Sequence, residues 1–381
     1  MASLFWPRFN NRATSCLASL VINMTKEFSL KFINHFLEIG GGRKIRCLHF
    51  VSFTLLLIAC SDSKETRVQR FLLQGNEKAL LQNFDEAEYY YKEAIKIDSC
   101  FADALNNLGT LYFKQGNFQL SIDYYSRAVE CRPGYVDALM NRANAFLESK
   151  EYYRALDDLS KVEKVQSDTA RVPFMKGLAL TQLSRHEEAI TAFKRAHALQ
   201  PQNAETLVNL GNVYFFKKNY DSATVHLQKA LQLDSEQPSA YNTLAIILTE
   251  KAQYAAAMDM VNKAIALNAT DAYAINNRGY IYLLTGEQEK AKDDFDQSIS
   301  IDPYNGWAYR NKGFYFLKVK DYEASIRMLT KAEKIDPHID QLYIAQAEAY
   351  LQMKDFSNAC KAYEKAVARN EKGNTSMKPC K

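Results

Sequence analysis

Residues 102–135 read ADALNNLGTLYFKQGNFQLSIDYYSRAVECRPGY, and residues 204–237 read AETLVNLGNVYFFKKNYDSATVHLQKALQLDSEQ. The two stretches are 34 residues long and align without a gap. Both place glycine at position 8, a small residue at position 20 and alanine at position 27. The same pattern returns at the same spacing along the chain. The sequence therefore predicts an array of repeats, which grows in one direction without a single central core.

Nine repeats follow one another without an insertion, and small residues mark each of them. They begin at Val68, Ala102, Val136, Ala170, Ala204, Pro238, Ala272, Gly306 and Asp340. Position 8 is Gly75, Gly109, Ala143, Gly177, Gly211, Ala245, Gly279, Gly313 and Ala347. Position 20 is Ala in seven repeats and Ser in two. Small residues at fixed points let two helix backbones approach closely, so each repeat is expected to be a helical hairpin.

Large residues occupy the complementary positions. Position 24 is Tyr91, Tyr125, Leu159, Phe193, Leu227, Val261, Phe295, Leu329 and Tyr363, and position 17 is mostly aromatic. Several repeats end in a proline, as in Ile301-Asp302-Pro303, which cannot continue the helix that it follows. Pro173 lies near the start of the fourth repeat, where proline is tolerated only in the first helical turn, so that helix is expected to be short.

This pattern resembles the tetratricopeptide-repeat (TPR) family over about four-fifths of the chain. The resemblance implies an all-α fold, a right-handed α–α superhelix of about nine 34-residue helical hairpins at residues 68–373, followed by a flexible tail at 374–381. It also implies that helix A of each repeat faces a concave groove in which protein or peptide partners bind. The family is specific for fold and weak for function, because its members bind very different partners.

Five repeats carry asparagine at position 6, which the resemblance places in the groove: Asn107, Asn141, Asn209, Asn277 and Asn311. A carboxamide both donates and accepts hydrogen bonds. These side chains could therefore hold the backbone of an extended peptide, or they could bond within and between repeats. The lysines with which chaperone-binding members of the family hold a terminal carboxylate are absent from position 5.

The seventh and eighth repeats hold the strongest candidate partner-binding patch: Tyr273, Asn276, Asn277, Tyr280, Trp307, Arg310, Asn311 and Phe314. Trp, Tyr and Arg are the residue types enriched in binding hot spots. Trp307 occupies position 2 while Tyr309 already fills the usual core position, which favours a contact surface. The alternative is that these residues pack between the repeats.

A leader precedes the repeats. Residues 43–59 combine a basic segment (Arg43, Lys44, Arg46) with an apolar run too short to span a bilayer. The run ends at Leu57-Ile58-Ala59-Cys60, which resembles the lipobox of bacterial lipoproteins. This implies a signal peptide within residues 1–59, lipidation at Cys60, a short tether at 60–67, and an envelope protein at the outer membrane or cell surface. The 42 residues before the basic segment are long for a signal peptide.

Composition argues against several other functions. Residues 1–59 carry seven Lys/Arg and two Asp/Glu, which leaves 41 basic and 42 acidic residues in the remainder. The remainder thus has no excess of positive charge of the kind that binds nucleic acid. No phosphate loop, metalloprotease or nucleophile motif is present, so we expect no enzyme and no cofactor. His186, His197 and His226 are interpreted as packing or surface residues and not as metal ligands. We expect Cys100 and Cys131, which lie at different positions of adjacent repeats, to be too far apart for a disulfide. A disulfide between Cys360 and Cys380 is open to the flexible tail, and we predict neither bond.

The sequence thus predicts a membrane-tethered scaffold for protein partners. Two alternatives remain open. A glycan-binding surface lipoprotein would be expected to interrupt its repeats with long insertions, and none occur here. A soluble intracellular scaffold would make residues 43–60 a coincidence.

Overall fold

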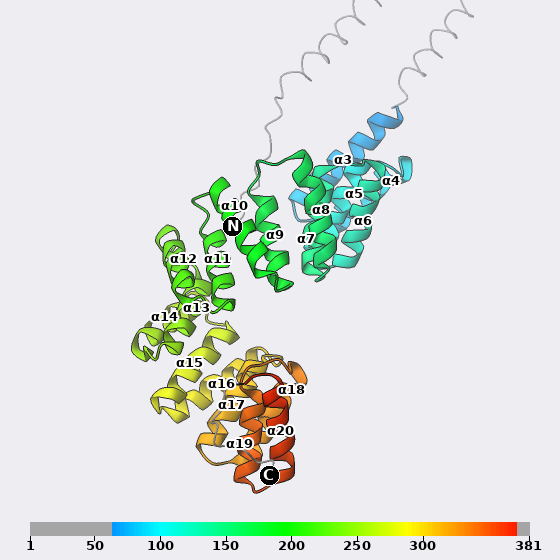
Figure 1. Cartoon of the computed structure of the whole chain (residues 1–381). Coiled ribbons are helices and arrows are strands. Elements are labelled where there is room, and N and C mark those ends of the chain that lie inside the picture. The colour runs from blue at the N-terminus through cyan, green and yellow to red at the C-terminus, as the bar shows by residue number, and fades with distance from the viewer. Residues whose placement is uncertain (1–62, 372–381) are drawn as a thin grey trace, which may run out of the picture. The chain divides into compact units, whose positions relative to one another are not determined.

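The computed structural model describes residues 63–371, and every regular element among them is an α-helix (Figure 1). The leader at 1–59, Cys60 and the tail at 374–381 lie outside these residues. The chain divides into two compact units after Arg70, and the repeats belong essentially to the second. None of the described helices combines the length and the apolar character that a membrane crossing requires.

The helices alternate as the first and second arms of hairpins, and neighbouring hairpins stack into an α–α superhelix (Figure 1). The first arms, helices A, are α3 (Lys64–Leu80), α5 (Ala102–Lys114), α7 (Val136–Glu148), α9 (Arg171–Gln182), α11 (Ala204–Phe216), α13 (Pro238–Glu250), α15 (Ala272–Thr285), α17 (Gly306–Lys318) and α19 (Leu342–Gln352). The second arms, helices B, are α4 (Phe84–Ile97), α6 (Phe118–Cys131), α8 (Tyr152–Val165), α10 (His186–Leu199), α12 (Tyr220–Leu233), α14 (Tyr254–Leu267), α16 (Gln288–Ile301), α18 (Tyr322–Ile335) and α20 (Phe356–Ala368).

Each described helix B begins at position 17 of its repeat, and position 16 caps it. In five of these helices the side chain at position 16 accepts a backbone hydrogen bond from the first turn: Asn83, Asn117, Asn219, Asp321 and Asp355. Such a cap satisfies one of the N–H groups that have no partner within the helix. The mostly aromatic position 17 is thus the first residue of helix B, directly after this cap.

The small residues at position 8 face the large residues at position 24, as the sequence predicts. A Cβ atom added to Gly177 would lie 2.6 Å from the Phe193 ring, and one added to Gly211 would lie 2.7 Å from Leu227. Phe193 and Leu227 are completely buried. In these two hairpins, close packing between the arms therefore leaves no room for a side chain at position 8.

The turn between the two arms has a conformation that the sequence does not reveal. Position 15 has a positive φ in every described repeat, but glycine occupies it only at Gly116 and Gly286. The other seven residues at this position are Gln82, Lys150, Ser184, Lys218, Ala252, Lys320 and Lys354. Residues with a Cβ atom rarely adopt this region, so these turns store strain.

Helix boundaries at both ends differ from the predicted repeat starts. Helix α3 begins at Lys64, within the expected tether, because the Ser63 hydroxyl accepts a hydrogen bond from the Thr66 N–H at 3.2 Å and caps the helix. Helix α19 begins at Leu342, two residues late, after Gln341 adopts a φ of 60°. Helix α9 has 12 residues with Pro173 in its first turn, which confirms the expected shortening.

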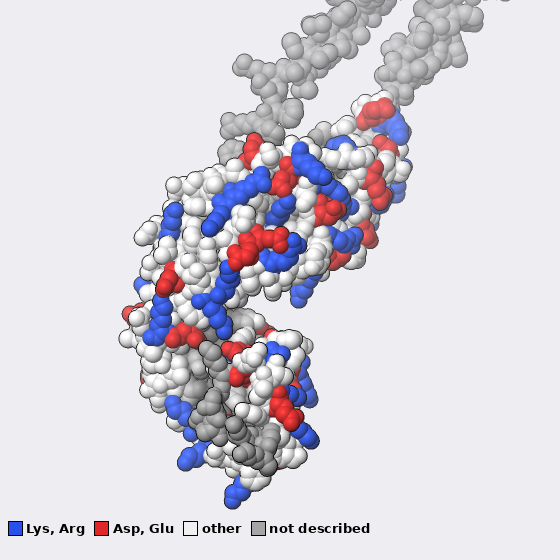
Figure 2. Space-filling view, viewed as in Figure 1, with Lys and Arg blue, Asp and Glu red and all other residues white. Residues whose placement is uncertain are grey.

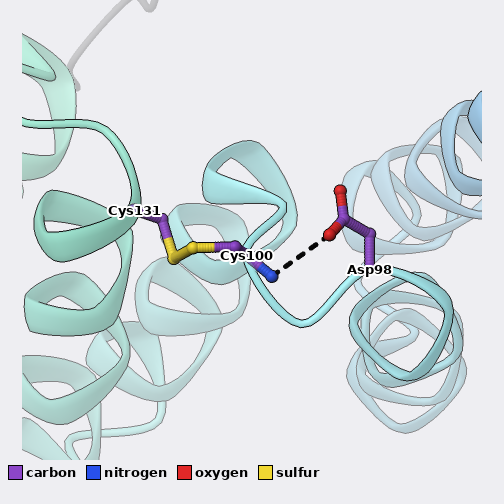
Figure 3. The surroundings of a disulfide bond; sticks show 3 residues. All are labelled: Asp98, Cys100 and Cys131. Atoms are coloured by element: carbon purple, nitrogen blue, oxygen red, sulfur yellow. Dashed lines mark hydrogen bonds between the residues drawn. A yellow bond between two sulfur atoms is a disulfide. The ribbon is translucent and has the colours of Figure 1, made fainter.

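Cys100 and Cys131 form a disulfide, so the expectation that they lie too far apart is wrong (Figure 3). Their Cα atoms are 5.2 Å apart. Cys100 lies in the turn that leaves the first repeat, and Cys131 is the last residue of α6. Stacking brings that turn beside the end of the next helix B, although the two residues occupy different positions in their repeats. Cys360 is disulfide-bonded as well, and Cys380 lies outside the described residues.

Candidate partner-binding surface

Helices α15 and α17 carry the candidate patch, and a buried polar network fixes where they start. The Asp271 carboxylate accepts hydrogen bonds from the N–H groups of Tyr273 and Ala274 at the start of α15. The completely buried Asn305 caps α17 and donates to the Ser298 hydroxyl at 3.1 Å, which donates to the Ala272 carbonyl at 2.7 Å. The first turns of the two helices are therefore held in a defined relationship.

Arg310 is the centre of the patch, and it is buried, with 8% of the residue exposed. Its guanidinium carbon lies 4.6 Å from the Trp307 ring centroid, 4.9 Å from that of Phe314 and 5.7 Å from that of Tyr280. It donates hydrogen bonds to Asn311 Oδ1 and, at 3.0 Å, to the Asp340 carbonyl. Burial lowers the pKa of this guanidinium to about 10. Arg310 thus orients three aromatic rings and joins α17 to the start of the next repeat.

Trp307 and Tyr273 are the most exposed members of the patch, with 38% and 50% of each residue exposed. Tyr280 and Phe314 are partly buried and pack against the apolar core beneath. The patch therefore combines exposed aromatic surface with a rigid polar support, which is the arrangement typical of a binding anchor.

The asparagines pair between repeats, as the second interpretation of the sequence expected. The carboxamide of Asn311 donates to Asn276 at 2.9 Å, that of Asn277 to Asn242 at 2.9 Å, and that of Asn141 to Asn106 at 3.0 Å. These pairs join position 6 of one repeat to position 5 of the repeat before it. Asn107 donates to Asn76 at 2.8 Å, and Asn209 donates to the Glu205 carbonyl of its own helix at 3.0 Å. This use of their donors leaves less capacity for a peptide backbone.

Acidic groups from other repeats lie near Arg310. The charges of Asp340, Glu250 and Glu371 raise its pKa against the effect of burial. Glu250 lies in α13, and the Glu371 carboxylate accepts a hydrogen bond from the Ile344 N–H in α19 at 2.9 Å. Over the face in Figure 2, basic and acidic side chains are interleaved without a field of one sign.

Two ion pairs that the sequence did not predict each join the two arms of one repeat. Arg142 at position 7 forms a bidentate pair with the buried Asp158 at position 23, with N–O distances of 2.7 and 2.8 Å. Arg278 and Asp294 repeat this geometry four repeats later. Arg142 and Asp158 line a cavity of about 340 Å³. The signal in the sequence is the shared spacing of 16 residues between arginine and aspartate.

The histidines of the fourth and fifth repeats occupy packing positions. His186 stacks on Phe216 with ring centroids 6.2 Å apart, and His226 stacks on Tyr214 at 5.3 Å. Among residues 63–371, no group of histidine, cysteine and acidic side chains is arranged to hold a metal ion.

Family models decide the classification. Models described as tetratricopeptide or TPR repeats match residues 75–116, 102–135, 177–218, 202–270, 272–305 and 340–372, which together exceed half of the chain. The chain belongs to the tetratricopeptide-repeat family. No curated protein sequence matches it. Because TPR arrays present protein-binding surfaces, this TPR protein is an interaction scaffold.

Solved structures share the TPR fold. The Cut9–Hcn1 complex of the APC/C is 16% identical over 81% of this chain and 74% of that chain, with a TM-score of 0.50. MamA from Desulfovibrio magneticus RS-1 is 22% identical over 45% of this chain and 97% of that one, with a TM-score of 0.43. PilF from Pseudomonas aeruginosa is 24% identical over 54% and 93%, with a TM-score of 0.47. At these identities the similarity concerns the fold alone.

Proposed function

We propose that this TPR array is a non-catalytic scaffold, tethered to a membrane of a bacterial envelope, that holds a protein partner on the aromatic patch of α15 and α17. The observation that carries the proposal is the exposed indole of Trp307, held in place by the buried Arg310 at 4.6 Å. Burying a large aromatic side chain that is already immobilised costs little conformational entropy on binding. The partner is expected to offer an apolar segment that covers Trp307 and Tyr273.

Binding can be tested without disturbing the support of the patch. A photo-crosslinking residue in place of Trp307 should form an adduct with one protein in intact cells, and the same residue in place of Tyr304 should not. Tyr304 is a suitable control because it is 80% exposed and lies in the turn before α17. With that partner purified, Trp307→Ala together with Tyr273→Ala should weaken binding about 30-fold or more, roughly 2 kcal/mol. Unchanged affinity with an unchanged melting curve would reject the site.

Two independent observations support export from the cytoplasm. The Cys100–Cys131 disulfide is of a kind that persists in oxidising compartments and is rare in the cytosol. The leader resembles a lipoprotein signal that ends at Cys60, outside the described residues. Two or more acyl chains on that cysteine would make a stable anchor.

The mass of the N-terminal peptide after expression of the full gene in a bacterium tests the anchor. We expect the peptide to begin at an acylated Cys60, and we expect Cys60→Ala to leave the membrane fraction. A soluble protein that retains residues 1–59 would contradict the tether but not the binding patch.

A further inference from the structure

Four basic groups meet between the second arms of the fourth and fifth repeats, away from the aromatic patch. Lys194 and His197 belong to α10, and His226 and Lys229 belong to α12. The Lys229 ammonium donates a hydrogen bond to Nε2 of the neutral His197 ring at 3.3 Å. Both lysines are exposed and both histidines are half-buried. We call these four residues the basic slot.

The basic slot differs from four other repeats, in which the charged residues at positions 7 and 23 pair with opposite charges. Asp158 and Asp294 occupy position 23 in the third and seventh repeats and bind an arginine at position 7. In the fifth repeat these two positions hold His226 and Leu210. In the fourth and eighth repeats, the lysine at position 7 pairs with an acid from the preceding helix B: Lys176 with Glu163 and Lys312 with Asp296.

No described carboxylate forms an ion pair with any of the four residues of the basic slot, whereas Arg195 beside them pairs with Glu163. The groups that face the histidines are Lys194 and His197 from α10, Lys229 from α12 and the stacked Tyr214 ring from α11. The two ammonium groups, and the two imidazoles when they are protonated, repel one another and gain stability from an anion. The slot is therefore positively charged, and the described chain supplies no carboxylate that neutralises it.

Each histidine of the slot also carries a ring nitrogen that makes no hydrogen bond within the described chain. The Nδ1 atoms of His197 and His226 are buried and have no hydrogen-bond partner. Burial, together with the charges of the neighbouring lysines, lowers the pKa of both imidazoles. An anion between the helices would offset that repulsion and favour the protonated rings, so anion binding and proton uptake are linked.

We propose that the basic slot between α10 and α12 binds a phosphate group, either free or as the headgroup of a lipid, and that it binds more tightly as the pH falls. A phosphate presents up to two negative charges and three acceptor oxygens at one point. Two ammonium groups and two imidazoles on adjacent helices supply a matching set of donors. This site goes beyond the partner-binding patch and does not depend on it.

Histidine ring resonances of the full chain provide the test. In inorganic phosphate, the pKa of His197 and of His226 should rise by about half a unit or more relative to sodium chloride at equal ionic strength. The double variant Lys194→Gln with Lys229→Gln should abolish the rise. Lys263→Gln is the matched control, because Lys263 has the same repeat position as Lys229 but lies over the Tyr241 ring. Equal pKa values in the two salts would overturn the proposal.

The source of the phosphate is distinguished with glycerol phosphate and with vesicles that contain phosphatidylglycerol or only phosphatidylcholine. Retention on the anionic vesicles at pH 6, lost in the lysine double variant and kept in Lys263→Gln, would assign a lipid headgroup. A free phosphate compound would be assigned by a different result. Glycerol phosphate would raise the pKa of the two histidines, while the native chain, the lysine double variant and Lys263→Gln would be retained equally on the anionic vesicles. Failure of both ligands to act through the two lysines would reject the slot.

Discussion

Cys131, the last residue of α6, is covalently bonded to Cys100, which lies in the turn between α4 and α5 (Figure 3). The bond ties the end of one helix B to the turn that closes the preceding repeat. In a linear array each repeat is stabilised mainly by its neighbours, and among the described repeats the first packs against one neighbour alone. We expect the disulfide to strengthen the attachment of this first described repeat to the second.

Replacing both cysteines by alanine should therefore loosen the first repeat in particular. We expect the free energy of local opening of α4 to fall by about 2–4 kcal/mol, as for a cross-link that closes a loop of about 30 residues. Amide hydrogen exchange of Tyr91 and Ala94 measures this directly. Cys360→Ala serves as the control, since it removes a cross-link at the other end of the array. Equal protection of α4 in both variants would contradict the assigned role.

The strained turns at position 15 predict a stabilising substitution. Ala252 has a φ of 56°, a conformation that costs an alanine about 1–2 kcal/mol and a glycine almost nothing. Ala252→Gly should raise the free energy of unfolding by about 0.5–1 kcal/mol after the larger chain entropy of glycine is counted. Gly116→Ala should lower it by a similar amount, because nothing lies within 4 Å of the added methyl group and only φ is affected. Urea denaturation of both variants tests the pair, and changes of the same sign would contradict the account.

The close contact between Gly177 and Phe193 predicts that the effect of Gly177→Ala on the free energy of unfolding depends on the residue at position 193. Gly177→Ala alone places a methyl group 2.6 Å from the Phe193 ring and should destabilise by about 1–3 kcal/mol. In the background of Phe193→Leu, the same substitution should be neutral or stabilising, because the third repeat natively pairs Ala143 with Leu159 and alanine favours the helix. Additive effects in thermal or urea unfolding would show that the two positions do not share this space.

The sequence was sufficient for the hairpins because their packing repeats: each glycine at position 8 meets the large side chain at position 24. It failed where a feature depends on one place only. The start of α3 depends on a local cap by Ser63, and the late start of α19 follows a left-handed Gln341. Proximity of Cys100 and Cys131 depends on the path of a turn across the stack, which the period of the sequence does not encode.

The candidate patch was only partly predictable for a related reason. Residue type marked Trp307 and Arg310 together, but exposure separates them, since one reaches solvent and the other supports it from below. The position-6 asparagines have the chemistry for either a peptide or a neighbouring repeat. Which partner they take is decided by the 35-residue offset between helices, as between Asn276 and Asn311, and that offset becomes visible only in the stacked structure.

The half-buried histidines predict how stability depends on pH. The pKa values of His197 and His226 are lowered in the folded chain, so the unfolded chain binds protons more readily. Stability must therefore rise with pH as the pH passes about 6.5, the ordinary pKa of histidine. That stability is fully present above about pH 7 and is lost progressively as the pH falls below 6.5. Replacing both histidines by glutamine should reduce the difference in melting temperature between pH 7.5 and pH 5.5, measured in chloride buffers without phosphate. An unchanged difference would assign the acid sensitivity to other groups, while adding phosphate to the native chain at pH 5.5 should restore part of the lost stability.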